Sequence, residues 1–117
     1  MSYKVYQLKI DRSVYDYVNE VGHSKAAEVY PEYKISMDVR FEGSEKWESW
    51  MFNHFGLVCE IDAQDLEDVF HIGNMGPEEK IVRHDRMHSV SVGDIIEDEN
   101  GVFHMVEGFG FNQVEVA

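Results

Sequence analysis

Two segments in the N-terminal part of the chain alternate between apolar and polar residues, which is the pattern of a half-buried β-strand. In residues 3–10 the apolar side chains Tyr6, Leu8 and Ile10 share one face. In residues 33–41 every second residue is apolar, and this is the most regular alternation in the sequence. We therefore expect strands over both ranges.

Apolar residues three and four positions apart predict helices between and after these strands. Asp11 or Ser13 is placed to cap the first helix, and Gly22 is placed to end it. A shorter helical turn is expected over residues 25–29. It would stop before Pro31, because the residue that precedes a proline is restricted to extended conformations.

Two more helices are expected in the middle of the chain. Ser44 is placed to cap a helix that ends at Gly56 and carries apolar residues on one broad face. After a short strand over residues 57–61, Asp62 is placed to cap a helix whose acidic first turn suits a positive helix N-terminus. Three apolar side chains of this helix would face the core: Leu66, Val69 and Phe70.

The C-terminal third contains the strongest turn signal. Residues 73–88, which include two glycines and a proline, are typical of a long loop. Asn100-Gly101 lies between apolar runs and predicts a type I′ hairpin, because both residues tolerate positive φ. Strands are expected over residues 90–97, 102–107 and 109–116.

Together these elements predict one α+β domain over residues 1–117, with a small, mainly antiparallel sheet or partly open barrel and two or three packed helices. Hydrophobic residues make up 44% of the chain, which is enough for an ordinary core. The chain has only two prolines and no low-complexity segment or internal repeat, so no linker is expected within it.

The chain is strongly acidic, with 23 Asp and Glu against 10 Lys and Arg and a formal net charge of −13. This charge repels nucleic-acid backbones and anionic membranes, and it attracts basic partners. It is also a common means of keeping a small protein dispersed in solution. Direct binding to nucleic acid or to a membrane is therefore disfavoured.

Cysteine content and the N-terminus indicate a cytoplasmic protein. Cys59 is the only cysteine, so no internal disulfide is expected, which fits a reducing compartment. Its neighbours on a predicted strand do not activate a thiol, so we expect a small buried apolar residue. No basic N-terminal region precedes an apolar stretch, and no apolar run is long enough to span a bilayer.

His84 and His88 have the spacing of the helical zinc motif, with Asp85 in place of the usual glutamate. On a helix the two imidazoles would share a face. However, the segment lies between a Gly-Pro loop and a strand pattern, and no third ligand is indicated. We expect a solvated loop without metal, and the metal site stays an alternative.

Two acidic clusters are the candidates for partner binding. They comprise Asp65, Glu67 and Asp68 at a predicted helix start, and Asp94, Glu97, Asp98 and Glu99 around the predicted hairpin. If both clusters fall on one face, their carboxylates would imitate the charge row of a DNA backbone. A normal solvated surface is the alternative. For Asp94 we also expect hydrogen bonds to backbone groups at the strand start.

Three short motifs occur together in the second half of the chain. They are Asp65-Leu66-Glu67-Asp68-Val69-Phe70 with Asn74, Met87-His88-Ser89-Val90-Ser91-Val92-Gly93-Asp94-Ile95-Ile96, and Gly108-Phe109-Gly110-Phe111. Over residues 55–116 they resemble the YodL-like domain, whereas residues 1–54, a predicted strand–helix–strand–helix portion, carry no part of the resemblance. It implies a mobile-element accessory protein of phages, plasmids or integrative elements, often near antirestriction functions, with no established catalytic residues. Ser91, Phe109 and Phe111 match motif positions of uncertain role.

The leading expectation is a small, non-enzymatic protein that binds a host macromolecule, such as a basic host protein, in the bacterial cytoplasm. Counter-defence or host takeover would be its purpose, and no cofactor is expected. Two alternatives stay open. One is a metal-dependent hydrolase that uses His84 and His88, and the other is a nucleic-acid-binding small barrel in which Trp47, Trp50 and Phe109 stack on bases.

Overall fold

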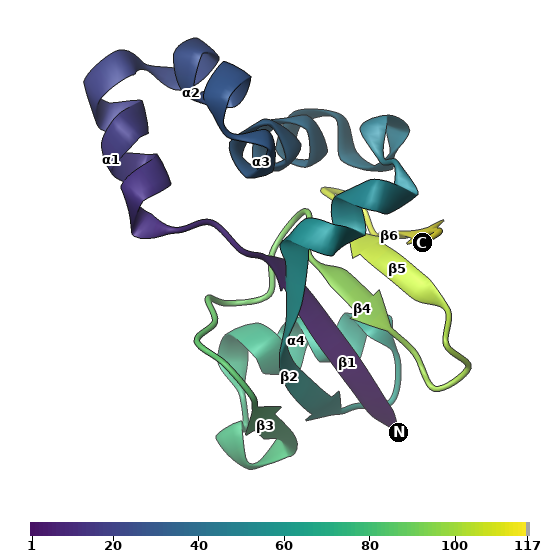
Figure 1. The fold of residues 1–117 in the computed structure, drawn as a ribbon. Helices are drawn as coiled ribbons and strands as arrows, with labels where there is room; N and C mark the ends of the chain where they lie inside the picture. Colours follow the sequence, from purple (N-terminus) through teal and green to yellow (C-terminus); the bar gives the residue numbers. More distant parts are fainter. Residues whose placement is uncertain (117) are drawn as a thin grey trace.

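The computed structural model describes residues 1–116, and its centre is a six-stranded antiparallel sheet (Figure 1). The strands are β1 (Ser2–Leu8), β2 (Phe55–Asp62), β3 (Ile81–Arg83), β4 (Ile95–Glu97), β5 (Phe103–Val106) and β6 (Phe111–Val114). Their order across the sheet is β3-β2-β1-β4-β5-β6. The outer strands β3 and β6 do not pair with each other, so the sheet is open. The α+β class and the antiparallel sheet are confirmed.

β1 lies in the middle of the sheet although it comes first in the chain. It pairs with β2 along its whole length and with β4 over residues 4–6. Residues 1–54 therefore supply a central strand of the same sheet to which residues 55–116 supply the other five.

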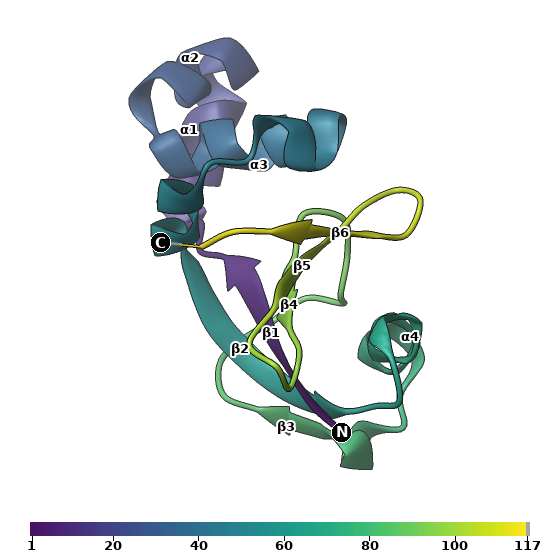
Figure 2. The ribbon, with the colours of Figure 1, turned by 90° about the vertical axis from the view of Figure 1, so that its right-hand side faces the viewer.

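Four α-helices occur within residues 1–116: α1 (Arg12–Val21), α2 (His23–Val29), α3 (Pro31–Glu42) and α4 (Leu66–Met75). Three 3-10 helices accompany them: η1 (Gly43–Lys46), η2 (Ser49–His54) and η3 (Glu78–Lys80). Figures 1 and 2 show α1, α2 and α3 grouped beyond one end of the sheet, and we call them the helical arm; α4 lies against one sheet face. No helix in the described part of the chain is long and apolar enough to cross a lipid bilayer.

Each face of the sheet has its own apolar cluster, and a third cluster lies within the helical arm. On one face Val69 and Ile72 of α4 pack with Ile61 of β2. On the other face Ile35 of α3 packs with Ile95 of β4. The alternation of side chains along each strand thus divides its apolar residues between two helix layers.

The predicted strand over residues 33–41 is wrong, because these residues belong to α3. Ile35 and Val39, one helical turn apart, pack on the sheet, whereas Tyr33 packs within the helical arm. Phe41 is 76% exposed. A helix that is buried on two sides has apolar residues on both sides instead of in a single stripe. In this segment they fall at every second position, which is the spacing expected of a strand.

The predicted α-helix over residues 44–55 is replaced by η1 and η2. The backbone is extended at Trp47, whose indole N–H donates to the carbonyl of Glu115 at 2.7 Å. The rings of Trp47 and Phe55 meet edge to face, with centroids 5.6 Å apart, and Met51 is buried against the sheet. These tertiary contacts hold the segment in short turns instead of a regular helix.

The C-terminal strands are shorter than predicted. The strand expected over residues 90–97 is reduced to β4, and the loop expected over residues 73–88 contains the end of α4, then η3 and β3. β3 pairs with β2 at the sheet edge. Its apolar pair, Ile81 and Val82, is too short to show an alternation, so β3 was not predicted.

Candidate protein-binding surface

The start of α4 and the tip of the β4–β5 hairpin meet beside the N-terminal end of β1. A hollow of about 360 Å³ between them is lined by Tyr3, Asp65, Leu66, Glu67, Asp98 and His104. Acidic residues from both predicted clusters, Asp65 and Glu67 of the first and Asp98 of the second, therefore come together in the structure.

Asp98 organises the hairpin tip. Its Oδ1 accepts the backbone N–H groups of Asn100 at 2.9 Å and Val102 at 3.0 Å. Its Oδ2 lies 2.9 Å from Nε2 of His104. The hydrogen bond with His104 is the main cause that lowers the pKa of Asp98, and the two backbone N–H groups act in the same direction. Asp98 therefore keeps its negative charge beside the hollow.

The hairpin predicted at Asn100-Gly101 is confirmed, but its turn type is not. Only Gly101 has a positive φ, at 77°, whereas a type I′ turn requires positive φ at both central residues. The N–H of Gly101 donates to the carbonyl of Asp98 at 3.1 Å, and the N–H of Asp98 donates to the carbonyl of Val102 at 2.9 Å. This longer turn leaves Glu99 exposed at the tip.

Asp65, and not the predicted Asp62, caps α4, because β2 extends through Asp62. Oδ1 of Asp65 accepts the N–H of Asp68 at 2.8 Å, and Oδ2 of Asp68 accepts the N–H of Gln64 at 3.0 Å. Glu67 lies between these two capping residues and is exposed. Its carboxylate therefore faces solvent and makes neither of the two capping hydrogen bonds.

The phenol of Tyr3 shows how close these carboxylates lie. Burial is the main cause that raises the pKa of Tyr3, and the negative charges of Asp65, Asp98, Glu99 and Asp68 raise it further. Residues from both clusters thus act on one side chain. We call Asp65, Glu67, Asp68, Asp98 and Glu99 the acidic surface.

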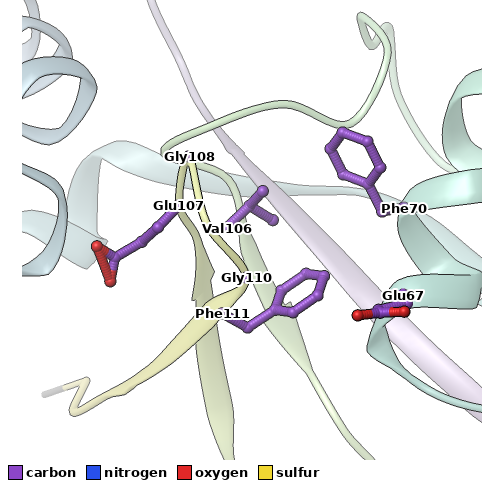
Figure 3. A pocket seen from close by; sticks show the side chains of 7 residues that line it. All are labelled: Glu67, Phe70, Val106, Glu107, Gly108, Gly110 and Phe111. Atoms are coloured by element: carbon purple, nitrogen blue, oxygen red, sulfur yellow. The ribbon is translucent and has the colours of Figure 1, made fainter.

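An apolar groove of about 360 Å³ adjoins the acidic surface at Glu67, between α4 and the β5–β6 hairpin. Figure 3 shows the side chains of Phe70, Val106 and Phe111 directed toward this space, whereas Glu107 points away from it. Phe70 was predicted to face the core, but it is 39% exposed. We call this the Phe70–Phe111 groove.

Asp94 and Glu97 do not belong to the acidic surface, although both were predicted as partner-binding residues. Asp94 is 4% exposed, and its Oδ2 accepts the N–H of Ser91 and the side-chain amide of Gln7, each at 3.0 Å. The bond from Ser91 confirms the predicted backbone contact of Asp94. Glu97 accepts the hydroxyl of Tyr6 at 2.8 Å, on the sheet face opposite α4.

The helical zinc motif is not formed, because residues 84–88 are not helical. Nε2 of His84 lies 2.7 Å from Oε2 of Glu60, whereas Nδ1 of His88 lies 3.2 Å from Nε2 of Gln7. The two imidazoles therefore have separate partners. Within residues 1–116, no three His, Cys, Asp or Glu side chains are grouped so that they could hold a metal ion.

The other motif and aromatic residues lie in different places. Phe109 is fully exposed at the β5–β6 turn, and Phe111 lines the groove. The ring of Trp47 packs edge to face on Phe55, and that of Trp50 packs edge to face on His54. Two members of the site were not predicted, Tyr3 and His104, because strand pairing alone brings them beside the acidic residues.

No protein-family model, curated protein or solved structure matched the chain. The chemistry of the chain's own surface is therefore the guide to its function. That surface places negative charge next to an open apolar groove, a combination that suits a protein partner.

Proposed function

We propose that this chain is a mobile-element accessory protein that acts by binding a bacterial protein with a basic surface, without catalysing a reaction. The meeting of two separate acidic segments around Tyr3 carries the proposal. The motifs that resemble the YodL-like domain support the mobile-element part. Counter-defence or host takeover is the purpose that we propose for this binding.

The acidic surface would attract the partner over a distance. The chain has a net charge of −13, and charge of one sign on a binding surface raises the association rate of an oppositely charged partner. Exposed ion pairs add at most about 1 kcal/mol each to affinity. The charge of the acidic surface therefore accounts for a high association rate and for selectivity rather than for high affinity.

The Phe70–Phe111 groove would supply the affinity. Interfaces take most of their binding energy from a few apolar or aromatic side chains that fill pockets near the centre. Burial of such a side chain contributes about 25 cal/mol for each Å² of apolar surface removed from water. Because the groove adjoins Glu67, we expect the partner to present an apolar side chain next to a lysine or arginine.

A charge reversal tests the proposal. Glu67→Lys changes the acidic surface without removing either of the two α4 capping bonds. Glu20→Lys is the matched control, because Glu20 is also an exposed helical residue but lies on α1 in the helical arm. Immobilised wild type and both variants are compared in pull-downs from a bacterial lysate, and the Kd of the recovered partner is measured.

We expect the wild type and Glu20→Lys to recover the same stoichiometric partner. Glu67→Lys removes an attractive charge and also places a positive charge against the partner's basic surface, so this repulsion should weaken binding roughly tenfold or more. Equal binding by all three proteins, or recovery of no stoichiometric partner by the wild type, would contradict the proposal. Phe70→Ala should weaken binding with little effect on its salt dependence, because it changes the groove and leaves the charges in place.

Nucleic-acid mimicry is the more specific form of the proposal. A partner that normally binds DNA would present its basic groove to the acidic surface. Duplex DNA should then displace that partner from the chain, and less effectively as the salt concentration rises. A partner that duplex DNA does not displace would exclude mimicry and leave ordinary protein binding in place.

A further inference from the structure

A second hollow, which we call the arm–sheet cleft, lies between the helical arm and the sheet. It has two adjoining parts of about 80 and 430 Å³, which share Leu8, Ile10, Tyr15 and His88. Figure 1 shows the segments that supply these residues: the end of β1 and its connection to α1, α1 itself, and the segment between β3 and β4. None of the residues of the acidic surface lines either part of this cleft.

The arm–sheet cleft is basic although the chain is acidic. Arg40 lines its smaller part, and Lys9 and Arg86 line its larger part. Nζ of Lys9 lies 2.6 Å from Oδ2 of Asp85, so its charge is offset. Arg40 and Arg86 form no ion pair within residues 1–116. An unpaired guanidinium presents a planar set of donors that fits the oxygens of a phosphate or carboxylate.

A buried carboxylate lines the same cleft. Asp94 lies in the part that contains Arg40. Its two side-chain hydrogen bonds, from Ser91 and Gln7, both go to Oδ2. Its Oδ1 accepts no hydrogen bond within the described residues, and because every buried side-chain oxygen and nitrogen there has a partner, Oδ1 is reached by solvent from the cleft. A donor group of a ligand, such as a hydroxyl, would satisfy this oxygen.

We propose that the arm–sheet cleft binds a small hydroxylated organic oxyanion, with Arg40 and Arg86 on the oxyanion and Asp94 on a hydroxyl group. The side chains of Ser36 and His88 add polar groups to the same walls. Phosphates and carboxylates share this chemistry, and the test below distinguishes them. The site is independent of the partner binding proposed above, since it shares no residue with the acidic surface.

The net charge of the chain does not prevent this binding. At physiological salt the Debye length is about 8 Å, so exposed charges farther away are largely screened. Arg40 and Arg86 therefore act on a ligand in the cleft more strongly than the distant acidic residues do, and Asp94, the acidic side chain that lines the cleft, is the one we place against the hydroxyl group. The apolar side chains of Leu8 and Ile10 border the cleft, and apolar walls strengthen charge interactions by excluding water.

The full chain is titrated with three probes while its backbone amide signals are followed by ¹H–¹⁵N NMR. Ribose 5-phosphate carries a phosphate, gluconate carries a carboxylate, and ribose is the neutral control. We expect saturable shifts around Ser91 and Gly93 with at least one oxyanion and none with ribose. Saturation by ribose 5-phosphate alone assigns a phosphate ligand, and saturation by gluconate alone assigns a carboxylate.

Substitutions test the residues. Arg40→Gln and Arg86→Gln should each weaken the oxyanion roughly tenfold, the effect of one charged hydrogen bond. Lys80→Gln makes the same change in net charge on η3, outside the cleft, and should leave the affinity unchanged. Amide spectra of the free variants check that each is folded. Failure of both oxyanions to saturate, equal binding of ribose, or equal affinity of the three variants would overturn the proposal.

Discussion

Replacing Asp94 with asparagine should make the protein more stable at neutral pH. The two hydrogen bonds to its Oδ2, from Ser91 and Gln7, fit the carbonyl oxygen of an asparagine equally well. The new NH₂ group would take the place of Oδ1, which accepts no hydrogen bond within residues 1–116. Asp94→Asn therefore keeps the hydrogen bonds of the buried site and removes its negative charge.

The size of the effect follows from the pKa of this carboxyl group. Burial raises the pKa of Asp94 from 3.8 to about 6, and it outweighs the opposing effects of the Ser91 N–H group, His88 and Gln7. One pKa unit is about 1.4 kcal/mol, so the charged form of Asp94 costs the native state about 3 kcal/mol.

The sign follows from proton linkage. Because the pKa of Asp94 is higher in the native state than in the unfolded chain, the native state holds this proton more tightly. The contribution of Asp94 to the free energy of unfolding is therefore most favourable below pH 3.8 and falls as the pH rises to about 6. Asp94→Asn has no such dependence, so its advantage over the wild type should grow across this interval and stay constant above it.

Urea unfolding followed by tryptophan fluorescence, in steps from about pH 3.5 to pH 8, measures this advantage. The difference between variant and wild type is the useful quantity, because the other carboxyl groups contribute equally to both. Asp16→Asn is the control, since Asp16 is exposed on α1 and loses the same charge. A variant no more stable than wild type above pH 6, or a difference independent of pH, would refute the reasoning.

Three further predictions concern packing, reactivity and capping. Gly93→Ala should destabilise the protein by about 1–3 kcal/mol in urea unfolding, because φ is +94° and the new Cβ would lie 2.9 Å from Cγ2 of Val39. Gly101→Ala, with φ +77° and open space around it, should destabilise the protein less. A larger loss of stability for Gly101→Ala than for Gly93→Ala would contradict this packing. Burial of Cys59 raises the pKa of its thiol to about 11. A disulfide reagent at pH 8 should therefore label Cys59 in urea but not in the native protein. Equal labelling rates under the two conditions would show that solvent reaches this thiol in the native protein. Asp65→Ala removes the α4 cap and should lower the free energy of unfolding by about 1 kcal/mol. Amide hydrogen exchange in the first turn of α4 should become faster. Unchanged exchange would mean that the cap does not stabilise this turn.

Local chemistry was enough to predict several elements. The alternation in residues 3–10 predicted β1, and Asn100-Gly101 predicted the β4–β5 hairpin. The apolar spacing after Asp65 predicted α4, although the capping residue was placed three positions early. These features depend on residues that are neighbours in sequence, so no knowledge of the distant chain was needed.

The candidate site was predicted only in part. The sequence supplied the acidic residues, but nothing in it placed Asp65 beside Asp98, because that proximity depends on the strand order β2-β1-β4. Tyr3 and His104 carry no local signal for the same reason. The arm–sheet cleft is a further case, since its walls come from segments that meet only after the helical arm folds back toward the sheet.

What the sequence by itself determined is the α+β class, the hairpin, most of the strand and helix positions, and the acidic character of the surface. Tertiary structure decided that residues 33–41 form α3 and that Asp94 is buried while Glu67 is exposed. Pro31 at the first turn of α3 suits a helix start, but the alternation that follows fits a strand equally well. Only the sheet on one side and α1 and α2 on the other make the helix the better solution, because each buries a different set of the apolar side chains of α3.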